Sequence, residues 1–150
     1  MTCEIYIQTN TRNPAVQKTV TARWLISSVL ENGQKVTRDG IACVNNATAK
    51  KAALIALADA LARFNKAAVI KIYISDDFVR NMLIMNMPER WAQNGWHKFR
   101  NNQEIKHEMQ WMYIKMFLAS HAVSYAGADE VRENKILKEM ERRLNNVKGK

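Results

Sequence analysis

The sequence is poor in cysteine. Its 150 residues include only Cys3 and Cys43, and neither has a second Cys or a His at zinc-ligand spacing. Both fall in predicted strands, which favours buried, reduced thiols over a disulfide. The three histidines, His97, His107 and His121, do not form a metal cluster by spacing. These absences argue against a zinc protein and against a fold that depends on disulfides.

Long apolar runs are also missing. No run approaches the roughly 18 to 20 residues that span a bilayer, and the N-terminal MTCEIYIQTN lacks the basic region and apolar stretch of a signal peptide. We therefore expect a cytoplasmic protein that makes no membrane contact. Repeats and low-complexity tracts are absent as well. The length fits a single domain, which we place at residues 1–147, with 148–150 as a disordered tail.

Acidic residues are scarce relative to basic ones. The chain has 14 Asp and Glu against 23 Lys and Arg, a net charge of +9, which favours a polyanionic partner. Between Trp91 and Trp111 the sequence reads WAQNGWHKFRNNQEIKHEMQW, so three of the four tryptophans alternate with Lys, Arg, His and Asn. Ring faces and cations together are typical of nucleic-acid-binding surfaces. The alternative for Trp91 and Trp111 is hydrophobic packing against the sheet.

The first third of the chain has the pattern of an antiparallel meander. Residues 4–8 alternate as a strand does, and residues 20–30 form a β-branched and aromatic run. The Asn32-Gly33 dipeptide follows directly, which is a hairpin signal. Residues 35–44 are the predicted return strand.

The remainder alternates between helical and strand patterns. Asn45, Asn46 and Thr48 offer capping residues before an Ala/Leu-rich helix. A buried strand follows that can lie parallel to the first strand. The element order predicts an α/β fold with a mixed five-stranded sheet, three antiparallel strands and then two parallel additions, and helices on both faces. Beyond residue 48 the predicted segments are a helix to residue 64, a strand at 67–75, helices at 78–85 and 105–120, a strand at 122–126 and a charged amphipathic helix at 129–147.

This order and several motifs resemble type 1 ribonuclease H over nearly the whole chain. EIYIQ resembles the first strand of that family, IYISDDFVRN the fourth strand with its Ser-Asp end before a short helix, and WAQNGWHKF the basic protrusion with its W-x-x-N-G-W core. The resemblance implies the ribonuclease H-like three-layer fold.

The resemblance also implies a chemistry, because family members cleave the RNA strand of an RNA/DNA hybrid with two Mg²⁺ ions held by four carboxylates. Two ions about 3.5 to 4 Å apart need bridging negative charge to offset their repulsion. Here the corresponding positions are Gln8, Ala49, Asp76 and Asn134, so one carboxylate remains. We expect no catalytic residue, at most a weak metal contact at Asp76, and no cofactor; Mg²⁺ is implied only if residual nuclease activity exists.

By the same resemblance the binding surface is retained. The leading hypothesis is a catalytically inactive domain that binds RNA/DNA hybrid or structured RNA through the basic protrusion. Lys50 could instead belong to a solvated helix face. The expected contact residues are Asn45, Asn46, Lys50, Trp91, Asn94, Trp96, Lys98 and Arg100.

Two alternatives remain open. The first is an inhibitor or adaptor that uses the protrusion against a protein partner in a nucleoprotein complex. The second is a true nuclease with a rearranged metal site that recruits Asp77, Glu130 or Glu133.

We also expect the Met-rich stretch to be core rather than a partner-binding groove. Its members are Met82, Met85, Met87, Met109, Met112 and Met116.

Overall fold

A five-stranded mixed sheet forms the centre of the molecule. The computed structural model describes residues 1–98 and 105–148. The strand order is β3-β2-β1-β4-β5. Strands β1, β2 and β3 pair antiparallel, whereas β4 is parallel to β1 and β5 is parallel to β4. This is the predicted topology. The strands are β1 (Thr2–Thr9), β2 (Gln17–Val29), β3 (Lys35–Ala47), β4 (Val69–Ile74) and β5 (Ala122–Tyr125).

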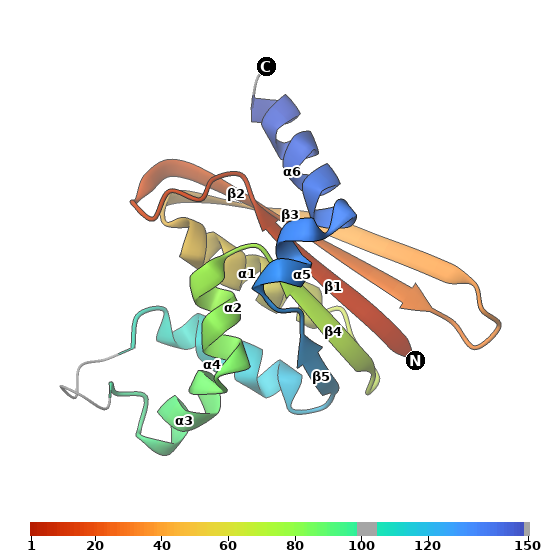
Figure 1. The fold of residues 1–150 in the computed structure, drawn as a ribbon. Helices are drawn as coiled ribbons and strands as arrows, with labels where there is room; N and C mark the ends of the chain where they lie inside the picture. Colours follow the sequence, from red (N-terminus) through yellow and green to blue (C-terminus); the bar gives the residue numbers. More distant parts are fainter. Residues whose placement is uncertain (99–104, 149–150) are drawn as a thin grey trace.

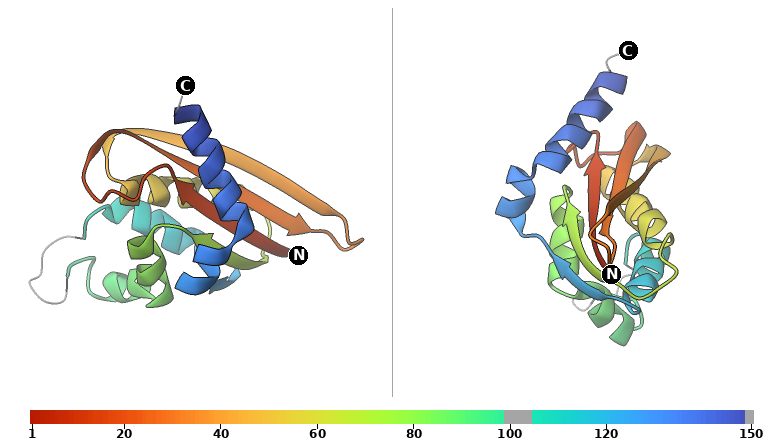
Figure 2. Two further views of the ribbon diagram at one scale, coloured as in Figure 1. Left: turned by 45° about the horizontal axis from the view of Figure 1, so that its top comes forward. Right: turned by 90° about the vertical axis from the view of Figure 1, so that its right-hand side faces the viewer.

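Helices cover both faces of the sheet and make three layers (Figure 1). The end-on view of Figure 2 shows α1 (Ala49–Leu61) and α4 (Glu108–Leu118) on one face. The other face carries α5 (Ala128–Glu133) and α6 (Lys135–Lys148). Between β4 and α4 lie two short helices, α2 (Asp77–Ile84) and α3 (Met87–Gln93). In the described ranges, no helix has the length and apolar character that crossing a membrane requires.

Strand β1 separates two cores, because successive side chains of a strand point to opposite faces. Ile5 and Ile7 are fully buried in the larger core, with α1 and α4. Tyr6 and Gln8 point to the other face, where Tyr6 stacks on Tyr73 with ring centroids 4.7 Å apart. This alternation places Gln8 under α6, where it contacts Glu141.

The β2–β3 hairpin depends on two glycines. Gly33 adopts φ 83° in the turn, as the Asn-Gly dipeptide predicts. Gly40 pairs with Trp24 across the strands, and a Cβ at Gly40 would lie 2.5 Å from the indole ring. The Trp24 ring therefore covers the backbone of the edge strand, and its Nε1 donates to Asp59 of α1 at 3.0 Å.

Several predictions about single elements are wrong. Cys43 is exposed, because it lies on edge strand β3 and on the opposite face from Ala42 and Val44, which pack against the larger core. The last helix is two helices, α5 and α6, divided at Asn134, whose backbone is extended. No element was predicted at Trp91, which lies inside α3 (Met87–Gln93).

The prediction of a methionine core is also wrong for most of the residues concerned. Met82 and Met87 are half-buried against the larger core. Helix α4 buries Trp111 and Ile114 instead, so its methionines lie on the other side of the helix. The exposed members are Met85, Met109, Met112 and Met116.

Candidate functional site

Gln8 occupies the first of the four positions where the resemblance implies a carboxylate. Its side chain is 2% exposed, and its Nε2 donates to Glu141 Oε2 of α6 at 3.0 Å. Gln8 Oε1 has no hydrogen-bond partner among the described residues. Glu141 also lies 3.8 Å from the guanidinium of Arg12. The carboxylate beside the end of β1 is therefore that of Glu141 in α6. It is paired with the amide of Gln8 and the guanidinium of Arg12.

The end of β4 places a serine, not Asp76, beside Gln8. Ile7 and Ile74 are partners in the parallel ladder, and Ser75 donates its N–H to Ile7 O at 3.0 Å. Asp76 comes one residue later and caps α2, because its Oδ1 accepts the N–H of Val79 at 2.9 Å. One carboxylate oxygen of Asp76 is thus committed to the helix start.

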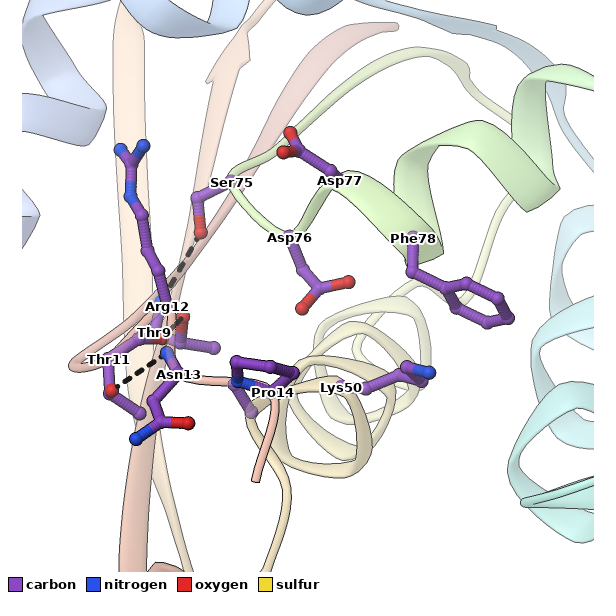
Figure 3. A pocket seen from close by; sticks show the side chains of 11 residues that line it. Thr9, Thr11, Arg12, Asn13, Pro14, Lys50, Ser75, Asp76, Asp77 and Phe78 are labelled. Atoms are coloured by element: carbon purple, nitrogen blue, oxygen red, sulfur yellow. Dashed lines mark hydrogen bonds between the residues drawn. The ribbon is translucent and has the colours of Figure 1, made fainter. Parts of the chain in front are cut away.

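Asp76 and Ala49 line one cleft of about 230 Å³, which we call the strand-end cleft. Figure 3 shows the Asp76 carboxylate directed toward Pro14 and Lys50, while Asp77 points away from it. Asp77 is bound by the buried Arg80 at 2.6 Å. Neither Gln8 nor Asn134 lines this cleft. Its lining is Thr9, Thr11, Arg12, Asn13, Pro14, Ala49, Lys50, Ser75, Asp76, Asp77 and Phe78.

Asn134 has a structural role at the break between α5 and α6. Its Oδ1 accepts the N–H of Leu137 at 2.9 Å, so it caps α6. Its side chain also interacts with Tyr6 and lowers the pKa of that hydroxyl, by less than burial and Glu4 raise it. Burial, followed by the Glu4 carboxylate, raises the pKa of Tyr6, whose hydroxyl donates to Glu4 at 2.5 Å. This phenol stays protonated and uncharged at neutral pH.

The other acids do not rebuild a metal centre. Glu130 pairs with Lys71 at 2.5 Å, in the middle of β4 rather than at its end, and Glu133 is exposed. Within residues 1–98 and 105–148, no group of three or more His, Cys, Asp or Glu side chains could hold a metal ion. The polar groups at the four positions are two amides and one capping carboxylate, a donor set that does not fit two Mg²⁺ ions.

A second cleft, of about 320 Å³, lies beside the first, and Lys50 and Phe78 line both. We call it the basic cleft. Lys50 Nζ lies 3.8 Å from the centre of the Phe78 ring, a cation–π contact. In the part of the chain that the structure describes, Lys50, Lys98 and Lys106 form no salt bridge. The cleft is lined by Lys50, Phe78, Met82, Trp91, Lys98, Ile105, Lys106, His107 and Trp111.

His107 reports the positive potential of the basic cleft. It precedes α4 in a left-handed conformation, φ 60°, and its ring is half-buried. Burial lowers its pKa first, and the charges of Lys51, Lys50 and Lys106 lower it further. The part of the pKa shift that comes from these three lysines reflects a positive potential, and a positive potential favours an anion.

The tryptophans form the floor of the basic cleft. Trp91 is 6% and Trp111 1% exposed, and their rings meet edge to face with centroids 5.3 Å apart. Packing, the alternative given for these two residues, is therefore confirmed, and neither offers a free ring face. Trp96 is half-buried in a left-handed conformation, φ 62°.

The remaining candidates, Asn45, Asn46 and Asn94, do not line either cleft. Asn94 Nδ2 donates to His97 O at 2.8 Å and stabilises the turn at Asn94-Gly95. Asn45 and Asn46 are exposed at the end of β3, just before α1. Asn45 Oδ1 accepts from Thr19 at 3.3 Å. Arg100 lies outside the described residues.

The sequence patterns did not identify Glu141 as part of this site. It lies 133 residues from Gln8, so no local spacing connects them. One signal was present: Glu141 follows Leu137 and Met140 at helical spacing, on the buried side of α6. A charged residue on an apolar helix face needs a polar partner from the element beneath it.

Comparison with known proteins identifies the fold. No family model matches the sequence, and no curated protein matches it either. The structure of LC9-RNase H1, a type 1 RNase H with the type 2 active-site motif, has a TM-score of 0.73 at 15% identity, covering 95% of this chain and 69% of that one. The solution structure of the PFV RNase H domain gives 0.62 at 13% identity, covering 95% and 90%.

A foamy viral protease-reverse transcriptase in complex with an RNA/DNA hybrid gives a TM-score of 0.68 at 14% identity. The match covers 95% of this chain but 19% of the viral protein, so the likeness concerns one part of that larger protein. All three are similar to this chain in fold at low sequence identity. The chain therefore has the ribonuclease H-like fold.

Proposed function

We propose that this chain binds nucleic acid, RNA/DNA hybrid or structured RNA, without cleaving it. The observation that carries the proposal is the basic cleft, where Lys50, Lys98 and Lys106 surround aromatic rings and form no salt bridge among the described residues. Unpaired cations beside a ring-lined hollow suit phosphates and sugars. The charges of Lys50, Lys51 and Lys106, which add to burial in lowering the pKa of His107, support the same interpretation.

The proposed absence of catalysis is supported by the structural roles of the residues at the four positions where the family has carboxylates. Gln8 binds Glu141, Asn134 caps α6, and Asp76 caps α2. Each polar group there thus holds the fold together. A two-metal mechanism needs carboxylates that bridge both ions, so the arrangement argues for binding without hydrolysis.

Structural neighbours support nucleic acid as the partner. The foamy viral protein is bound to an RNA/DNA hybrid, and a related structure of it is bound to dsDNA. A cleft that contacts backbone and shape rather than base edges has weak sequence specificity.

Fluorescence anisotropy with a labelled RNA/DNA hybrid tests the proposal. Lys50, Lys51, Lys98 and Lys106 give up to four phosphate contacts, so we expect a log-log salt slope of about −3.6 and roughly 150-fold weaker binding at 200 mM than at 50 mM salt. Lys106→Glu should reduce the slope by about 1. Lys66→Glu is the matched control, because this exposed lysine follows the far end of α1.

Two outcomes would overturn the proposal. Absence of binding at micromolar concentration, or binding that does not change with salt, would favour the adaptor hypothesis, in which the protrusion contacts a protein. Hybrid cleavage in Mg²⁺ or Mn²⁺ that is lost in Asp76→Asn would show a rearranged nuclease.

A further inference from the structure

Helix α4 presents a stripe of large apolar side chains to solvent. Met109, Met112, Tyr113 and Met116 are 62%, 41%, 48% and 57% exposed. Their spacing of three and four residues places them on one face of the helix. The opposite face holds the buried Trp111 and Ile114, so the fold does not cover this stripe. We call these four residues the α4 stripe.

The α4 stripe is symmetric about its own midpoint, between Met112 and Tyr113. A second α4 packed antiparallel across a two-fold axis at that midpoint brings Met109 against Met116 and Met112 against Tyr113. Every apolar side chain then meets another, as an isologous interface requires. Methionine side chains adapt readily to such contacts.

Charges beside the α4 stripe complement this arrangement. Glu108 and Lys115 are seven residues apart, about two turns, and so lie on the same flank of the helix. The two-fold axis reverses the direction of the second helix but leaves this flank on the same side of the helix pair. Glu108 of one copy therefore lies opposite Lys115 of the other. Lys115 already pairs with Glu89 at 3.3 Å, whereas Glu108 forms no ion pair among the described residues.

The size of the contact sets its strength. A large side chain buries roughly 150 to 250 Å² when fully covered, so four half-exposed ones offer on the order of 400 Å². This is about half of the ~800 Å² per partner that stable interfaces bury. We propose that α4 is a homodimerisation surface and that two copies associate weakly through antiparallel α4 stripes.

Sedimentation velocity between about 10 µM and 1 mM tests the proposal, with reductant present because Cys43 is exposed. We expect a monomer–dimer equilibrium with a dissociation constant on the order of 100 µM. Met112→Glu should weaken it at least about tenfold, since it places a charge in the apolar contact. Met85→Glu is the matched control, because Met85 is 53% exposed at the end of α2.

A charge exchange provides the second test. Glu108→Lys should weaken the dimer, and combining it with Lys115→Glu and Glu89→Lys should restore it, because both ion pairs of Lys115 are then only reversed in sign. A protein that stays monomeric up to 1 mM overturns the proposal and leaves the stripe to a different partner. A dimer that is insensitive to Met112→Glu overturns it too.

Discussion

Gln8→Glu should destabilise the protein in a way that depends on pH. The substitution keeps the shape of the side chain but replaces the amide that donates to Glu141 at 3.0 Å with a second carboxylate. Two charges at that distance repel by about 5.5 kcal/mol at an effective dielectric constant of 20. Taking up a proton instead costs about 4 kcal/mol at pH 7. The Glu141 side chain is 43% exposed, so water screens the repulsion, and we expect about 2 to 3 kcal/mol.

The pH dependence follows from the sign of the shift. A neighbouring carboxylate raises the pKa of the introduced Glu in the folded state, so the folded protein binds the proton more tightly than the unfolded chain. The variant is therefore least destabilised below pH 4.3, roughly the pKa of a Glu in the unfolded chain, and it loses stability as the pH rises. We expect the loss to grow by about 1.4 kcal/mol per pH unit and to level off near pH 6.

Urea unfolding followed by circular dichroism at pH 4.5, 5.5 and 7 measures this effect, with Gln8→Met as the control. Gln8→Met loses the same hydrogen bond without adding charge, which costs about 1 kcal/mol at every pH. The quantity to compare is the difference in the free energy of unfolding between Gln8→Glu and Gln8→Met at each pH. If this difference were independent of pH, the side chain at position 8 would not lie against Glu141, and α6 would not pack on this end of β1.

Four further outcomes are expected. Trp111→Ala should lower the free energy of unfolding by about 3 to 5 kcal/mol, since the ring is 1% exposed. Asn134→Ala should cost about 1 kcal/mol through loss of the α6 cap, also measured by urea unfolding. Gly40→Ala should cost about 1 to 3 kcal/mol and change the near-ultraviolet circular dichroism of Trp24, because the new Cβ displaces the ring. Because the pKa of His107 is lowered in the folded protein, its contribution to stability is present above the pKa of about 6.5 in the unfolded chain and is lost as the pH falls. Hybrid binding should tighten over the same pH range. His107→Gln should remove both effects.

Local patterns predicted most of the fold. The alternation in β1, the Asn32-Gly33 turn and the capping Thr48 each fix an element through residues close in the chain, and the structure has all three. The break at Asn134 was not predicted, although the spacing indicates it: the positions three and four residues after Val131 are Asn134 and Lys135, so the apolar face of α5 does not continue into α6. Asn134 divides them by offering its side chain to Leu137 N.

The site was harder to predict, because its contacts join distant parts of the chain. Which side of α4 faces inward cannot be decided from periodicity, since Trp111 and Met112 both lie on apolar faces. The larger, stiffer indole fills the core beside Trp91, and the methionines are left outside. The contact between Gln8 and Glu141 likewise depends on how α6 crosses β1.

Helix α4 also connects two surfaces. Its first turn follows His107 in the basic cleft, and its outer face carries the α4 stripe. In the proposed dimer one particle therefore holds two basic clefts, and a nucleic acid long enough to reach both is held at two points. The second contact then forms at an effective concentration set by the distance between the clefts rather than by the bulk protein. Long hybrids should accordingly be retained at protein concentrations where short ones dissociate.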